Sequence, residues 1–242
     1  MSLLTVVRDV CAVVGVVAPT SVFANTNRTM FEMVANANEM AQRIAYDTRD
    51  WTALRTTTTF NGDGVLTGPP PDPPEILGTT AWNLPADYKR LLLTSNVWCS
   101  TSMQQPVRFI SDADEWVRRR LANHTDGWGE WTLLGGKMHI VPVMMVGTSA
   151  SFVYLDKNCV QLTSGGRGDR FMEDTDSFVL DERLLKLGMI WNWKKDKGSP
   201  YAENMGEYSD AIANAMGHDQ PAPILSDRPL LANGGWSNAI LG

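Results

Sequence analysis

Two stretches near the N-terminus repeat apolar residues every three or four positions, the spacing of a helix that buries one face. Ser2 can cap the first helix and Pro19 follows its end. Its apolar positions are Leu3, Val6, Val7, Val10, Val13, Val14 and Val17. The second helix is expected from about Asn27 to Arg49. Its stripe comprises Met30, Phe31, Val34, Ala37, Ala41, Ile44 and Ala45.

A similar pattern returns near the C-terminus and predicts a pair of helices over residues 176–217. The first helix runs from about Asp176 to Lys197. Its apolar positions are Phe178, Leu180, Leu184, Leu185, Leu187, Met189, Ile190 and Trp193. Gly198-Ser199-Pro200 interrupts the pattern, because glycine favours a helix end and proline a helix start. The second helix is expected from Pro200 to Met216, with Gly217 ending it.

The middle of the chain has the short apolar and β-branched runs that are typical of strands. The threonine-rich run Arg55–Phe60 leads into the turn signal Asn61-Gly62-Asp63-Gly64. Gly135-Gly136 predicts a two-residue hairpin turn. Asp112 to Leu121 predicts a short helix, capped by Ser111 or Asp112. The other predicted strands are 89–98, 107–110, 131–134, 138–141 and 150–156.

Two stretches predict no regular structure. Residues 68–78 contain Gly-Pro-Pro-Pro-Asp-Pro-Pro, a proline density that excludes helix and strand interiors. They form either a plain surface loop or an extended arm that reaches a neighbour. Residues 218–242 have no periodicity and are rich in Pro, Gly, Asn and Ser, yet they keep several apolar side chains. We expect an extended tail that docks on another surface, with a disordered end as the alternative.

These elements predict an α+β protein. The N- and C-terminal helices form a helical bundle with an inserted small antiparallel β domain and an extended C-terminal tail. The predicted divisions are N-terminal helices over 1–54, a β-rich domain over 55–175, a helical hairpin over 176–217 and the docking tail over 218–242.

Composition narrows the function classes. The 242 residues carry a net charge of −6, and the isoelectric point is near 5.1. An acidic chain lacks the basic face with which a general nucleic-acid binder neutralises phosphates. Cys11, Cys99 and Cys159 are isolated, so a disulfide framework or a zinc site is not expected, and a reducing compartment is. The nine tryptophans favour packing and interfaces.

The apolar residues 10–18, followed by Val22-Phe23-Ala24, leave a signal peptide open as an alternative. Arg8 and Asp9 interrupt the run, and the residues before them are not basic, so an amphipathic helix is the favoured interpretation. The run is also too short for a membrane span.

The search for catalytic chemistry finds no nucleophile, metal or phosphate motif. The histidines at positions 124, 139 and 218 are scattered, and His139 fits a strand. The glycine-rich run 165–170 lacks the Lys-Ser/Thr of a phosphate loop, and its Arg-Gly-Asp, a tripeptide of integrin ligands, is short enough for chance. We therefore expect a flexible loop there, and no catalytic residue, cofactor or metal in the protein.

Two acidic features of the sequence each allow two interpretations. Asp174, Asp176, Asp181 and Glu182 could bind a divalent cation, or cap the helix that follows and complement its dipole, which we favour. Glu130, next to Trp128 and Trp131, is the one hint of a hydrolase acid, and a structural hairpin is the favoured interpretation. Lys194, Lys195 and Lys197 at a helix end suit the dipole, or else contact DNA or an acidic neighbour.

An ordered series of motifs resembles the head-to-tail connector adaptor proteins of tailed phages. Leu84-Pro85-Ala86-Asp87-Tyr88-Lys89-Arg90-Leu91 resembles the family's motif before its β region. Glu115-Trp116, the Gly135-Gly136 hairpin and Pro142 follow in the expected order. The C-terminal part of the pattern comprises Asp174-Thr175-Asp176, Leu180, Leu184, Leu185, Gly188, Ile190 to Lys194, Gly198, Tyr201-Ala202-Glu203, Tyr208 and Ala211. The resemblance covers residues 25–217, and neither the proline-rich loop nor the tail has a counterpart in it.

The resemblance implies a structural virion protein of the neck, assembled in the host cytoplasm, and no enzyme. Such adaptors form a ring, commonly of twelve copies, beneath the portal protein. Their helices contact the portal and neighbouring copies, and their β region faces the next neck or tail protein. Double-stranded DNA passes through the channel without sequence-specific contact, which agrees with an acidic chain.

The expected site is therefore a set of interface residues. Trp191, Trp193, Tyr201 and Tyr208 fix the helical hairpin internally or contact a neighbouring subunit. Leu230, Leu231 and Trp236 anchor the tail on the portal or an adjacent copy. The alternatives are another neck component, a stopper or tail-terminator, and a virion-associated hydrolase. The helices at both ends disfavour a stopper or terminator, because those proteins are mostly β.

Overall fold

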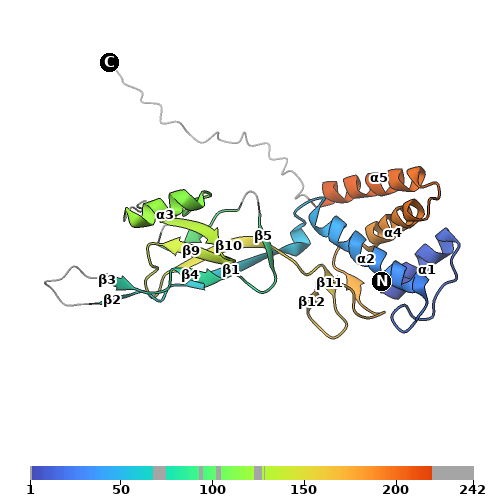
Figure 1. Ribbon diagram of the computed structural model, residues 1–242, viewed down its shortest axis with the longest axis horizontal. Helices are drawn as coiled ribbons and strands as arrows, with labels where there is room; N and C mark the ends of the chain where they lie inside the picture. The colour runs from blue at the N-terminus through green and yellow to red at the C-terminus, as the bar shows by residue number, and fades with distance from the viewer. Residues whose placement is uncertain are drawn as a thin grey trace, which may run out of the picture.

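The computed structural model describes residues 2–67, 75–92, 95–101, 105–122, 127 and 129–219. These residues form a mixed α+β protein with five α-helices and several antiparallel sheets, so the predicted α+β class is confirmed. Figure 1 shows an elongated molecule, in which most of the helices gather at one end and the larger sheets at the other.

The two N-terminal helices confirm the prediction in type and position. Helix α1 spans Leu3–Val14, and its first turn is capped because the Thr5 N–H donates to Ser2 Oγ at 3.4 Å. Helix α2 spans Arg28–Tyr46 and is capped by Asn27, with Met30, Met33, Ala37, Met40, Ala41 and Ile44 buried. The predicted apolar faces of the two helices are wrong for one residue each. Gly15 ends α1 at φ 75°, which leaves Val17 outside the helix and 89% exposed, and Phe31 of α2 is 61% exposed.

The C-terminal helices are α4, Glu182–Asp196, and α5, Ala202–His218. Helix α4 contacts α1, α2 and α5, and buried residues surround it on several sides. A helix buried in this way has no single apolar stripe. The predicted helix starts are wrong: residues 177–178 form a strand and α4 begins after its cap Asp181, while α5 begins two residues after Pro200. Gly217 lies inside α5 and does not end it.

The helical end has a hydrophobic core formed by α1, α2 and α4, with Ile212 of α5 at its margin. A small three-stranded sheet joins this core through Cys159, Val160 and Phe178. Its strands, in the order β12-β11-β13, are β11 Val160–Gln161, β12 Arg167–Gly168 and β13 Ser177–Phe178. The predicted flexible loop over 165–170 is wrong in part, because it contains β12.

A second hydrophobic core lies between two larger sheets. The β10 sheet has the order β1-β10-β5, with β6 also paired to β10. The β9 sheet has the order β4-β9-β8-β7, antiparallel except for the β7–β8 pair. The strands are β1 Arg55–Asn61, β4 Ala81–Asn83, β5 Tyr88–Leu91, β6 Trp98–Cys99, β7 Arg108–Phe109, β8 Glu130–Leu134, β9 Lys137–Val141 and β10 Ser149–Asp156.

Several strand predictions are confirmed, including the hairpin at Gly135 and Gly136, which have φ 59° and 73°. The predicted strand 89–98 is wrong, because it divides into β5 and β6. Helix α3, Ala113–Leu121, is capped by Asp112 as predicted. Within the predicted irregular stretch 68–78, Glu75–Leu77 forms strand β3, which pairs with β2, Val65–Thr67. Residues 68–74 lie outside the described residues.

The two ends of the molecule meet at a junction of polar contacts. The Tyr46 hydroxyl donates to the Asp156 carbonyl oxygen at 3.2 Å, and Arg90 pairs with Asp50. Arg167 donates to the Ala53 carbonyl oxygen at 3.2 Å. The chain crosses this junction through residues 47–54 in one direction and 156–159 in the other. The junction therefore holds the helical core and the sheets together through side chains from both.

Candidate interaction surfaces

The four predicted interface residues of the α4–α5 hairpin differ in their exposure and in their contacts. Trp191 is 8% exposed, and its ring lies 5.8 Å from the Tyr208 ring, between centroids. Trp193 is equally buried but lies under Lys197, whose Nζ is 4.7 Å from the ring centroid. Tyr201, at the start of α5, is 39% exposed. Trp191 and Tyr208 thus fix the hairpin internally, and Tyr201 alone of the four offers a large free surface.

Gly188 of α4 lies where the side chains of Met40 from α2 and Tyr208 from α5 approach the helix closely. A Cβ added there would lie 2.7 Å from Met40 Cε and 3.2 Å from a ring carbon of Tyr208. Burial in the same contact raises the pKa of the Tyr208 hydroxyl to about 12. A buried amide pair, in which Asn192 Nδ2 donates to Asn36 Oδ1 at 2.9 Å, fixes α4 against α2. The hairpin is therefore a rigid support for whatever α5 presents outward.

Helix α5 lies on α4 and leaves most of its own surface free. Within α5 only Ile212 is buried. The side that faces away from α4 carries small residues, with Met205 beside them at 46% exposed. The small residues on this outer face of α5 are Ala202, Gly206, Ser209, Ala213 and Gly217. A helix face of this composition lets another backbone approach closely.

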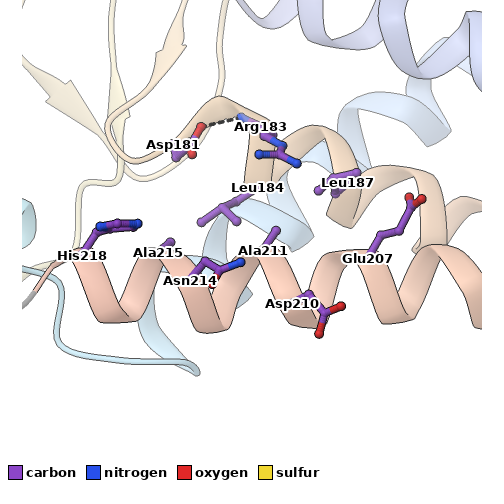
Figure 2. Close-up of a pocket in the computed structure, with 10 residues that line it drawn as sticks. All are labelled: Asp181, Arg183, Leu184, Leu187, Glu207, Asp210, Ala211, Asn214, Ala215 and His218. Atoms are coloured by element: carbon purple, nitrogen blue, oxygen red, sulfur yellow. Dashed lines mark hydrogen bonds between the residues drawn. The ribbon is translucent and has the colours of Figure 1, made fainter.

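An open groove of about 590 Å³ runs along one side of α5, between it and the N-terminal half of α4. Figure 2 shows Arg183 and Glu207 directed into the space between the helices, and Asp210 directed away from α4. Asp181 and His218 lie toward the other end of the groove. Acidic side chains outnumber basic ones along it, so the groove favours a basic partner.

The β2–β3 hairpin is the second exposed surface, and Figure 1 shows it projecting from the body at the end away from α1, α2, α4 and α5. Val65, Leu66 and Leu77 on its strands are each more than half exposed. The Gly62 N–H donates to the Thr148 carbonyl oxygen at 2.9 Å, and Gly64 bonds to Met144, which anchors the root of the hairpin. Two strands with apolar side chains in solvent are marginally stable alone.

The outer face of the β10 sheet holds a third surface, a groove of about 600 Å³. Arg55, Thr57, Ser151 and Val153 lie on its floor, because β1 and β10 pair Thr57 with Val153 and Thr59 with Ser151. Trp98 is 45% exposed at its side. A large exposed aromatic beside threonine and serine side chains gives this face an apolar centre within polar surroundings.

The favoured prediction for the acidic cluster before α4 is right only in part, because Asp181 caps the helix whereas Asp174 and Asp176 accept hydrogen bonds from loop N–H groups. Asp181 caps α4 by accepting from the Arg183 N–H at 2.8 Å. Asp174 accepts from the N–H groups of Val22 and Phe23 at 2.9 and 3.0 Å, which fixes the segment between α1 and α2. In the part of the chain that the structure describes, no three His, Cys, Asp or Glu side chains are grouped so as to hold a metal ion.

Asp176 is almost fully enclosed beneath this cluster. Burial alone would raise its pKa. Hydrogen bonds from the N–H groups of Met172, Thr163 and Glu173, at 2.7 to 2.9 Å, outweigh burial and hold the pKa below its usual range. The carboxylate therefore organises the loop that leads into α4.

Glu130, the residue that suggested a hydrolase, is completely buried and forms ion pairs with Arg119 and Arg120 of α3. Arg119 also pairs with Glu115 at 2.9 Å, and the Arg120 guanidinium lies 4.5 Å from the Trp116 ring centroid. These contacts hold α3 against β8. In this arrangement Glu130 is a structural anchor, in agreement with the structural interpretation favoured from the sequence.

Three of the predicted interface residues, Leu230, Leu231 and Trp236, lie outside the described residues. The hairpin patch, with Val65, Leu66 and Leu77, was missed by sequence analysis. Its signal was weak: short apolar runs on either side of the proline-rich stretch, which are too short to show a strand pattern. Trp98 was missed because the sequence placed it at the end of a longer strand, 89–98.

Comparisons with known proteins find no protein-family model that matches the chain and no curated protein with significant similarity to it. Among the described helices, none combines the length and the apolar character needed to cross a membrane.

Proposed function

We propose that this protein is a head-tail adaptor of a tailed phage, a structural subunit that forms a ring beneath the portal and joins the capsid to the tail. The observation that carries the proposal is the exposed, unpartnered packing surface at each end of the molecule. One is the outer face of α5, and the other is the β2–β3 hairpin. A subunit that buries such surfaces only on assembly fits a ring.

Helices near both ends of the described chain support an adaptor over a stopper or tail-terminator. In this proposal α1, α2, α4 and α5 form one bundle, and the β sheets with α3 are an insertion within it. The bundle faces the portal and neighbouring copies through α5, and the hairpin faces the next neck protein. DNA passes through the ring without specific contact, as the net charge of −6 favours.

The arrangement of α5 makes the proposal specific. Its acidic groove, with Glu207 and Asp210, lies beside the outer face that carries Met205 and Gly206. A partner helix that packs on the small residues would bring basic side chains over the groove. We therefore assign this face of α5 to the contact with the portal or a neighbouring copy.

The test is the mass of the purified protein in analytical ultracentrifugation, alone and mixed with the portal protein of the same phage. A single subunit that joins a defined ring on the portal supports the proposal. A protein that never binds the portal contradicts it, and lytic activity on cell walls would then support the hydrolase alternative.

A matched pair of variants tests the surface itself. Met205→Glu places a charge on the outer face of α5 and should abolish ring formation. Val117→Glu makes the same change on α3, where Val117 is 51% exposed, and should leave ring formation intact. Equal effects of the two variants would remove α5 from the interface.

A further inference from the structure

Strand β1 has one edge to which no other strand of the described chain is paired. It pairs with β10 along its whole length, and it is the end strand in the order β1-β10-β5. With seven residues, it is the longest strand at a sheet edge in the part of the chain that the structure describes. Such an edge presents a row of N–H and C=O groups that can bind another strand.

The hydrogen bonds to β10 show which residues of β1 direct their backbone groups toward the open edge. The Gly62 N–H donates to the Thr148 carbonyl oxygen at 2.9 Å, in continuation of the β1–β10 register. Because backbone direction alternates along a strand, the even-numbered residues of β1 bond to β10. The N–H and C=O groups of Thr57 and Thr59 therefore point away from β10, and within the described chain no hydrogen bond reaches them.

Strand β1 lacks the features by which sheet edges usually avoid pairing with other molecules. Those features are proline, lysine, an inward-pointing charge, a bulge or a covering element. The sequence of β1, Arg-Thr-Thr-Thr-Thr-Phe-Asn, has no proline and no lysine, and its register with β10 has no bulge. Every second residue from Arg55 to Asn61 is exposed. The edge is therefore open to a strand from another molecule.

We infer that two copies of the protein pair antiparallel through their β1 edges. With the two-fold axis at Thr58, Thr57 of each copy lies opposite Thr59 of the other, and each such pair exchanges two hydrogen bonds. Threonines directly opposite each other are a favourable pair, whereas like charges are not. Arg55, the one charged residue of the strand, lies opposite Asn61. In this register all seven residues of the two strands overlap, so it forms the most contacts of the two-fold registers.

This contact is small and therefore reversible. A pair of single strands buries less than about 1,200 Å², the range of transient complexes. Single subunits therefore dominate in dilute solution, and dimers form as the concentration rises. A ring built from one repeated head-to-tail contact contains no such two-fold axis. The dimer is thus a state of the free protein, and it does not depend on the adaptor proposal.

Sedimentation velocity with two variants at Thr57 tests the contact. Thr57→Pro removes an N–H that points away from β10, where a sheet edge tolerates proline, and Thr57→Val keeps both the N–H and the branched side chain. Between about 1 and 200 µM, wild type and Thr57→Val should change from single subunits to dimers. Thr57→Pro should associate at least about tenfold more weakly, because each copy loses a hydrogen bond. The inference is overturned if wild type stays single throughout, or if the two variants associate equally.

A disulfide across the two-fold axis gives a second measurement, which holds even if Thr57→Pro lowers the stability of the sheet. Residues directly opposite each other in an antiparallel pair are within reach of a disulfide. In a Cys99→Ser background, where the two remaining cysteines are buried, Thr58→Cys should form a covalent dimer on oxidation. Val117→Cys is the control, because Val117 is 51% exposed on α3, and its dimer should form about tenfold more slowly. Equal rates would overturn the inference. Ring formation on the portal is a separate readout, so failure here leaves the adaptor proposal untouched.

Discussion

At the scale of single residues, buried charges fix loops and helices whose backbones would otherwise be loosely held. Asp176 receives backbone hydrogen bonds from two segments, and Glu130 receives two arginines from α3. A buried charge stabilises the fold only while its partners are present. Removing either the charge or a partner therefore lowers the free energy of unfolding by a large amount. The two sites therefore allow clear predictions.

Asp176→Asn should destabilise the protein by about 2 kcal/mol at pH 7, because hydrogen bonds to a charged group contribute about 1.5–3 kcal/mol. The native pKa of Asp176 lies below the unfolded value, which is about 3.9. The stabilisation is therefore fully present above about pH 5, where the carboxyl is ionised in both states, and is lost as the pH falls through the native pKa.

Urea unfolding at pH 7 and pH 3 checks this prediction. The difference between wild type and variant should shrink at pH 3, and a difference independent of pH would contradict it. Asp181→Asn is the control, because asparagine also caps helices and should change stability little.

Glu130→Gln should destabilise the protein by about 3 kcal/mol, because it removes the charge that faces Arg119 and Arg120 in a buried site. Glu115→Gln is the matched control: its side chain is 35% exposed, and the loss should be below about 1 kcal/mol. Thermal unfolding of both variants measures the difference. Similar losses would mean that Glu130 is not the anchor of α3.

At the scale of elements, the glycine at position 206 lowers the stability of α5, and no contact within the single subunit compensates for this loss. A Cβ on Gly206 would meet nothing within 4 Å, and glycine in an exposed helix is about 1 kcal/mol worse than alanine. Gly206→Ala should therefore raise the stability of the free protein by about 0.5–1 kcal/mol. The added methyl lies on the outer face of α5, so under the proposed adaptor function the same variant should weaken ring formation on the portal.

Thermal unfolding and ultracentrifugation measure the two effects separately. Ala213→Gly, on the same face, should act in the opposite sense on stability and leave close approach intact. If Gly206→Ala stabilises the protein without affecting the ring, the outer face of α5 is not at a close contact.

Long elements could be predicted from the sequence, and short ones could not. Helices α1 and α2 show their periodicity over several turns, and β1, β8, β9 and β10 each fill a recognisable apolar or threonine-rich run. Strands β11 to β13 have two residues each, which is too short for a pattern. Helix α4 was predicted to start too early because Phe178 is buried by the small sheet, and its apolar character resembled a helical position.

In the candidate site, too, some features could be predicted from the sequence and others could not. The α4–α5 hairpin was predicted because its apolar positions repeat. The pairing of Trp191 with Tyr208, and the exposure of Tyr201, depend on how α5 crosses α4, which periodicity along one helix does not determine. Trp98 is exposed because β6 is only a short partner of β10, a consequence of contacts distant in sequence.

At the scale of the whole molecule, the polar junction couples two hydrophobic cores. Arg90 with Asp50, and Tyr46 with Asp156, link residues from the two ends. While these contacts hold, the cores should unfold in one cooperative transition. The double variant Tyr46→Phe with Arg90→Ala should separate the transition into two.

Differential scanning calorimetry measures this separation. Arg28→Ala is the control, because its pair with Glu32 is on the surface and should leave a single transition. A single sharp transition in the double variant would show that packing, rather than the junction, couples the cores.

The register of β1 and β10 has a consequence for the gene. Arg55, where β1 begins, is the direct partner of Leu155, near the end of β10. Residues paired in this way are about 5 Å apart, a distance that a short turn can bridge. The DNA between these two codons can therefore be exchanged as a cassette while α1, α2, α4 and α5 keep their places. Such an exchange would change what the sheets contact without altering what the helices bind.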